Sequence, residues 1–166
     1  MFKIKPLTKA FNRVKFQSGF SELDGYLKKT ARQHDSKNIS KTFVIIDDEK
    51  EDDILGFYTL CACEVISEKM PQKYAKKYPE KVSAIKLARL AVEKKSQRQG
   101  LGGLMMVDAF KKTLSVSEQI GVVGFFVDAK TDEAKHYYLQ YGFIELPGNP
   151  LKLFLPIQTI KALFKP

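Results

Sequence analysis

Hydrophobic residues recur along the chain with two periods, every second residue as in strands and every third to fourth as in helices. Strand-like runs occupy residues 2–7, 41–48, 54–66, 82–92, 121–129, 143–148 and 151–157. Helical spacing predicts helices over residues 21–34, from Gly100 onward, over 132–142 and at the C-terminal end, and residues 71–79 predict a short helix or loop. Antiparallel strands followed by strand, helix, strand and helix predict an α/β (α+β) fold with one parallel crossover.

Individual residues refine this order. Pro6 is expected to end the first strand or to confine it to an edge of the sheet, because proline cannot donate to a ladder. Residues 82–92 are apolar on both faces, which predicts a place in the middle of the sheet. The charged segment 47–53 predicts the turn of an antiparallel pair. Gly142 is expected to end the helix that begins near residue 132.

Composition places the chain among ordinary globular proteins, with 166 residues, 44% hydrophobic and 28% charged. No linker or repeat divides it, so we expect one domain over residues 1–166. The formal net charge is +9. Such an excess favours polyanions such as nucleic acids or phosphorylated cofactors, although solubility alone explains it equally well.

Cys61 and Cys63 stand two residues apart in a strand, where both face one side and cannot form a good disulfide. We expect buried packing thiols and no metal site. Reduced thiols, the absence of a signal-like N-terminal segment and the absence of a membrane-length apolar run predict a cytoplasmic protein without membrane contact.

The sequence Gln-Arg-Gln-Gly-Leu-Gly-Gly at residues 97–103 follows an apolar strand and begins a helix. It is either a tight linking turn or a cradle of backbone amides for phosphates, since amides at a helix N-terminus lack intrahelical acceptors and favour anions. Its glycine spacing matches neither a Walker loop nor a dinucleotide fingerprint.

Residues 87–110 and 128–146 together resemble the two signatures of the GNAT acetyltransferase superfamily, in the same order. The resemblance implies the GNAT fold, a central mixed, mostly antiparallel sheet with a splayed parallel strand pair and flanking helices. It implies acetyl-CoA as acetyl donor and no metal. The residues implied to bind the cofactor are Leu90, Ala91, Val92, Gln97, Arg98, Gly100, Gly102 and Gly103.

Tyr138 matches the family tyrosine that protonates the departing thiolate, a role that suits a phenol with an ordinary pKa near 10. Core packing is the alternative, because Tyr137 and Tyr141 cluster nearby and are themselves expected to be structural. No convincing general base is found. His34 and His136 are expected at the surface, and Glu64 is either a weak base candidate or a solvated strand end.

Residues 16–48 resemble the start of the GNAT toxins of bacterial toxin–antitoxin modules. That resemblance implies acetylation of the α-amine of aminoacyl-tRNA, inhibition of translation and neutralisation by a ribbon-helix-helix antitoxin. Candidate RNA contacts are Lys37, Lys41 and Arg89, with Lys73, Lys76 and Lys77 in addition.

Two other functions stay open. A GNAT enzyme could act on a protein lysine or a small polyamine, although the acidic turn 47–53 is expected to lie away from the cofactor. The second alternative is a basic module that binds RNA or DNA and catalyses no reaction. Monomer and homodimer are equally compatible with the sequence.

Overall fold

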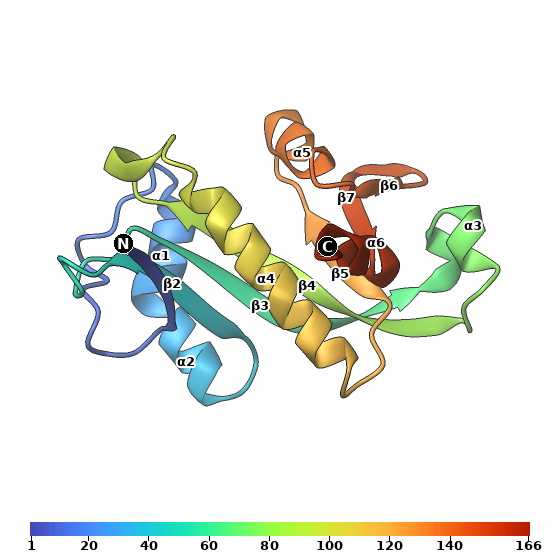
Figure 1. The fold of residues 1–166 in the computed structure, drawn as a ribbon, viewed down its shortest axis with the longest axis horizontal. Helices are drawn as coiled ribbons and strands as arrows, with labels where there is room; N and C mark the ends of the chain where they lie inside the picture. Colours follow the sequence, from blue (N-terminus) through green and yellow to red (C-terminus); the bar gives the residue numbers. More distant parts are fainter. The chain divides into compact units, whose positions relative to one another are not determined.

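The structure, a computed structural model, describes residues 1–166. The strands are β1 (Phe2–Pro6), β2 (Lys41–Asp47), β3 (Gly56–Ile66), β4 (Lys81–Val92), β5 (Gly124–Asp128), β6 (Ile144–Leu146) and β7 (Asn149–Pro156). The helices are α1 (Ser21–Lys29), α2 (Ala31–Ser36), α3 (Gln72–Ala75), α4 (Leu101–Ser117), α5 (Asp132–Leu139) and α6 (Ile157–Leu163), with 3₁₀ turns η1 (Ser67–Lys69) and η2 (Lys94–Ser96). Figure 1 shows these elements.

The seven strands form one sheet in the order β1-β2-β3-β4-β5-β7-β6. β1 pairs with β2 and β2 with β3, both antiparallel, and β7 pairs antiparallel with β5 and β6. β4 and β5 form the parallel pair. The predicted mixed sheet with one parallel crossover is confirmed, as are the edge position of the first strand and the central position of residues 82–92.

The chain divides into two compact units. Unit 1 comprises residues 1–61 and 88–109, and unit 2 comprises residues 62–87 and 110–166. In unit 1, α1 and α2 lie beside β2 (Figure 1). Their buried Leu27 and Ala31 join Val44 and Phe57 in the core, where the rings of Phe16 and Phe57 meet edge to face at 5.6 Å.

Unit 2 has a second core around β5 and β7, which α6 contacts. The rings of Phe126 and Phe154 stack at 4.7 Å in this core. Gly124 permits the close pairing of the two strands, because a Cβ there would stand 2.3 Å from the carbonyl oxygen of Leu155. Any larger residue at this position would therefore push β5 and β7 apart.

Three local expectations differ from the structure. The helix expected over residues 21–34 is two helices, because Thr30 (φ −121°) leaves the helical region between α1 and α2, where a β-branched residue has little helix preference. Cys61 and Cys63 are half-buried rather than buried, and neither is in a disulfide. α5 ends at Leu139, and Gly142 (φ +97°) completes the turn that follows it.

None of the helices combines the length and the apolar character that a bilayer crossing requires.

Candidate active site

The loop from Gln97 to Gly103 belongs to unit 1, follows β4 and η2, and includes the first three residues of α4. Two of its residues adopt the left-handed conformation, Arg98 (φ +68°) and Gly100 (φ +79°). Glycine adopts this conformation without strain, whereas an arginine is rarely found there. Gly100 faces open space, since a Cβ at this residue would meet nothing within 4 Å.

The backbone amides of this loop are not used by the fold. Leu104 donates the first helical hydrogen bond of α4, to the carbonyl of Gly100 at 3.1 Å. The N–H groups of the preceding residues, 97 to 103, donate to no acceptor in the chain. Unpaired amides at the start of a 17-residue helix form the kind of site that binds phosphate oxygens.

Side chains and backbone bonds hold the loop in place at its beginning. The Gln97 side-chain amide donates to the carbonyls of Ser18 and Val92, both at 3.1 Å. The Glu93 carboxylate accepts from the Gln17 backbone at 2.8 Å, and Lys94 N donates to the Gln17 carbonyl at 2.7 Å. The loop is therefore fixed by the segment before α1 while its own amides stay unpaired.

β4 reaches beyond its parallel partner. The ladder with β5 contains three residue pairs and ends at Leu87 and Val127, whereas β4 continues to Val92. The three predicted cofactor contacts Leu90, Ala91 and Val92 lie in this extension. Gly56 of β3 lies close to it, because a Cβ there would stand 2.9 Å from the Ala91 carbonyl oxygen.

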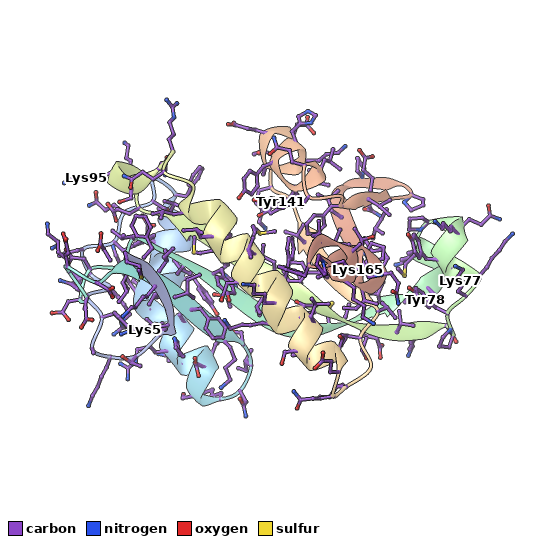
Figure 2. The ribbon with its side chains drawn as sticks, in the orientation of Figure 1. Lys5, Lys77, Tyr78, Lys95, Tyr141 and Lys165 are labelled. Atoms are coloured by element: carbon purple, nitrogen blue, oxygen red, sulfur yellow. The ribbon has the colours of Figure 1, made fainter.

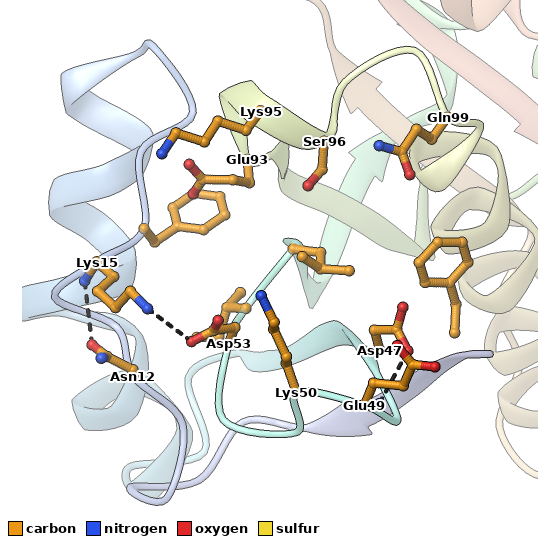
Figure 3. A pocket seen from close by; sticks show the side chains of 14 residues that line it. Asn12, Lys15, Asp47, Glu49, Lys50, Asp53, Glu93, Lys95, Ser96 and Gln99 are labelled. Atoms are coloured by element: carbon orange, nitrogen blue, oxygen red, sulfur yellow. Dashed lines mark hydrogen bonds and ion pairs between the residues drawn. The ribbon is translucent and has the colours of Figure 1, made fainter.

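A pocket of about 510 Å³ lies beside the loop within unit 1 (Figure 3). Ser96 and Gln99 line one side of it, and the acidic turn contributes Asp47, Glu49 and Asp53. The acidic turn between β2 and β3 therefore lines the same pocket as Ser96 and Gln99. Several of its carboxylates are neutralised locally, as in the 3.2 Å ion pair between Lys15 and Asp53.

Tyr138 belongs to unit 2 and lies near the end of α5, which Thr131 caps by accepting a hydrogen bond from Ala134 N at 3.1 Å. Its half-buried ring meets Phe143 edge to face at 5.8 Å and Tyr137 at 5.5 Å. These contacts fix the ring, as expected of either a packing or a catalytic tyrosine.

The three tyrosines of this helix end differ in their hydroxyls. Tyr137 and Tyr141 form a hydrogen bond with each other at 3.1 Å; Tyr141 is labelled in Figure 2. The Tyr138 hydroxyl has no partner in the chain and is not enclosed. Burial of the ring, and then the neighbouring Tyr141, raise the pKa of Tyr138 to about 12. Tyr138 therefore keeps its proton and can donate it.

The predicted RNA contacts lie in both units. Lys73, Lys76 and Lys77 are exposed residues of unit 2, and the other three belong to unit 1. Lys37 is exposed after α2, and Lys41 forms a 3.1 Å ion pair with Asp35. Arg89 lies over the ring of Tyr26, with 3.6 Å between the guanidinium carbon and the ring centroid.

The sequence did not predict the residues around the contact between Arg89 and Tyr26. The Tyr26 hydroxyl hydrogen-bonds with Ser40 Oγ at 2.9 Å and with His34 Nδ1 at 3.2 Å, so His34 is a half-buried partner of Tyr26 rather than a surface residue. No helical spacing indicates this pair, because the break at Thr30 lies between the two residues.

The remaining titratable candidates are exposed. His136 points to solvent on α5, and Glu64 is 4.0 Å from the ammonium of Lys81. No group of three or more His, Cys, Asp and Glu side chains is arranged to hold a metal ion.

The loop fits a diphosphate, because its amides are unpaired and an open face adjoins Gly100. A sequence family described as the acetyltransferase (GNAT) domain matches residues 38–145. A "tRNA-acetylating toxin" of Mycobacterium tuberculosis (strain ATCC 25618 / H37Rv) is 34% identical over 148 residues, which are 89% of this chain and 87% of that protein.

Solved structures agree over nearly the whole chain. AtaT complexed with acetyl-methionyl-tRNAfMet is 29% identical, with a TM-score of 0.92 over 99% of this chain and 100% of that one. A mutant AtaT toxin bound to acetyl-CoA and the C-terminus of the antitoxin AtaR is 27% identical, with a TM-score of 0.85 over 99% of each chain. On the fold, the family match and these relatives, the chain belongs to the GNAT acetyltransferases.

Proposed function

We propose that this acetyltransferase is a toxin that transfers the acetyl group of acetyl-CoA to the α-amine of aminoacyl-tRNA and so inhibits translation. The observation that carries this proposal is full-length similarity to proteins with that substrate. A relative at 34% identity is named a tRNA-acetylating toxin, and a structure with a TM-score of 0.92 holds acetyl-methionyl-tRNA.

The cofactor side of the site is assigned to unit 1. The amides of Gln97, Arg98, Gly100, Gly102 and Gly103 bind the diphosphate of the cofactor, and the exposed Arg98 guanidinium adds a charge-assisted contact. The backbone of Leu90, Ala91 and Val92 binds the pantetheine arm as an added strand. The unpaired amides and the extension of β4 beyond Leu87 support this assignment.

The chemistry needs few protein groups. Acetyl-CoA supplies an activated acetyl thioester. The neutral α-amine attacks the thioester carbonyl carbon, and a backbone N–H near Val92 stabilises the negative charge that develops on the carbonyl oxygen. As the C–S bond breaks, the Tyr138 hydroxyl donates its proton to the departing sulfur, and the proton that the new amide nitrogen loses passes through water and restores the hydroxyl. The raised pKa of Tyr138, about 12, keeps that proton in place at cellular pH.

The substrate amine requires no dedicated base. An α-amine has a reference pKa of about 8, against about 10.4 for a lysine side chain, and esterification of the neighbouring carboxyl lowers it further. A sizeable fraction is neutral at cellular pH. The exposed His136 and the ion-paired Glu64 are accordingly given no catalytic role.

The same proposal includes a partner and a location. A small ribbon-helix-helix antitoxin neutralises the enzyme, in line with a relative bound to the C-terminus of its antitoxin. The protein acts in the cytoplasm, where its tRNA substrate is found, as a monomer or a homodimer. Its formal charge of +9 favours binding of the polyanionic tRNA.

Label transfer from acetyl-CoA tests the function. The protein is incubated with acetyl-labelled coenzyme and charged tRNA, and label is expected in the RNA fraction. Mild alkaline hydrolysis of the ester should then release an N-acetyl amino acid. Deacylated tRNA is the control and should stay unlabelled, because it carries no α-amine.

If label enters protein lysines or added polyamine and none enters RNA, the substrate is a lysine or a polyamine and not aminoacyl-tRNA. The test is informative because the pocket beside the loop includes carboxylates, which a polyamine would contact.

A further inference from the structure

Unit 2 contains a pocket of about 400 Å³ that the proposed chemistry does not use. Its size falls within the roughly 300–1,000 Å³ range of ligand pockets. Tyr74 and Tyr78 line it together with Lys73 and Lys77, and so do Val122, Val123 and the start of α6. No acidic residue lines it, in contrast to the pocket beside the loop of unit 1.

The two tyrosine rings are held at fixed positions. They lie 6.5 Å apart with an interplanar angle of 23°, and Tyr74 also meets the fully buried Phe154 edge to face at 5.5 Å. Backbone hydrogen bonds from Val123 N to the Ser83 carbonyl and from Ile157 N to the Val123 carbonyl, at 2.8 and 2.9 Å, fix two other residues that line the pocket. The half-buried rings therefore present flat surfaces at little entropic cost of binding.

Positive charge surrounds these surfaces. Lys73 and Lys77 are exposed, and the Lys73 ammonium is 5.6 Å from the centroid of the Tyr74 ring. Figure 2 shows Lys77 and Tyr78 where the chain leaves α3. Burial, and then the neighbouring Tyr74, raise the pKa of Tyr78, so its ring adds no negative charge.

We infer that this pocket binds an unpaired nucleotide of the tRNA substrate, with its base against Tyr74 and Tyr78 and its phosphates near Lys73 and Lys77. The inference rests on the proposed function and deepens it. Aromatic faces combined with flexible ammonium groups are the common means of binding single-stranded nucleic acid. A paired stem offers no open base face, so this pocket recognises unpaired positions.

Binding of a fluorescein-labelled, deacylated tRNA tests this directly, without catalysis. Tyr78→Leu should raise the Kd roughly tenfold or more, because an aromatic–base stack is lost while the apolar contact remains. Tyr78→Phe should bind as the wild type does, since it keeps the ring. A fully paired RNA duplex should bind both variants and the wild type equally.

The lysines should respond differently from the ring. In the double variant Lys73→Gln/Lys77→Gln, the dependence of log K on log salt should become shallower by about 1.5, because two phosphate contacts are lost. Lys9→Gln/Lys165→Gln removes the same charge from two exposed residues outside the pocket and should leave the slope unchanged. Tyr78→Leu should keep the wild-type slope.

Unchanged tRNA affinity of a folded Tyr78→Leu protein, or an equal loss for duplex RNA, overturns the inference. Ultraviolet crosslinking of tRNA to the wild type gives a second measurement, and a nucleotide attached to the peptides that contain Tyr74 or Tyr78 is expected. If the wild type acetylates no aminoacyl-tRNA, the proposed function is wrong. The inference about the pocket is still tested, because the binding measurements do not depend on catalysis.

Discussion

The loop of unit 1 and the end of α5 in unit 2 contribute to the proposed reaction in different ways. The loop offers backbone N–H groups, and most of its side chains are exposed or absent. The end of α5 offers one hydroxyl on a ring fixed by aromatic contacts. Substitutions in the loop should therefore change the KM for acetyl-CoA, whereas loss of the Tyr138 hydroxyl should change kcat.

The largest effect is expected for Tyr138→Phe. It removes the only proton donor assigned to the departing thiolate, so kcat should fall roughly 100-fold or more. The ring contacts with Tyr137 and Phe143 do not involve the hydroxyl and should persist. Steady-state acetylation of charged tRNA measures the loss.

Calorimetric titration with acetyl-CoA provides the control for this variant. The Kd should match that of the wild type, because the amides proposed to bind the diphosphate belong to unit 1. Near-normal turnover of Tyr138→Phe would mean that Tyr138 is a packing residue. The end of α5 would then contribute no catalytic group to set against the backbone amides of the loop.

The pH dependence gives the next largest effect. Because the pKa of Tyr138 is raised to about 12, the hydroxyl stays protonated throughout the usable range. The rate should rise about tenfold per pH unit below the pKa of the substrate's α-amine, which lies at or below about 8, and then level off.

No fall is expected before the pH approaches the pKa of Tyr138. Initial rates from about pH 6 to about pH 10, with an amide-linked substrate analogue that resists hydrolysis, measure this profile. A decline near pH 9 would mean that a group with a lower pKa donates the proton.

Periodicity predicted most elements of this fold because the apolar face of each element points into the core of its own unit. The strands at residues 41–47 and 82–92 and the helix after Gly100 are found where the pattern placed them. The break at Thr30 was missed, because the apolar spacing of Leu23, Leu27 and Ala31 continues through it.

Contacts between distant segments were also beyond sequence reasoning. The acidic turn at Asp47 and Asp53 meets the segment after β4 at one pocket, and nothing local in either segment indicates this. Tyr74 and Tyr78, by contrast, stand four residues apart among lysines, so these aromatic and basic residues form a local cluster in the sequence although α3 ends at Ala75. That signal was present in the sequence.

A moderate effect is expected for Arg98→Asn. Asparagine tolerates the left-handed conformation of this position, so the loop should keep its shape while a charged contact to the diphosphate is lost. The KM for acetyl-CoA should rise roughly tenfold with kcat unchanged, since a charge-assisted hydrogen bond contributes about 1.5–3 kcal/mol. Lys95→Gln removes the same charge three residues earlier and should change KM far less.

The smallest effect on turnover is expected for Tyr141→Phe. It breaks the 3.1 Å hydrogen bond with Tyr137, which should lower the free energy of unfolding by about 1 kcal/mol in urea titrations. Activity should stay within about twofold of the wild type, because the hydroxyl of Tyr138 is left intact. A loss as large as that of Tyr138→Phe would assign the proton donor to the tyrosine cluster as a whole. The catalytic contribution of α5 would then come from several hydroxyls and not from that of Tyr138 alone.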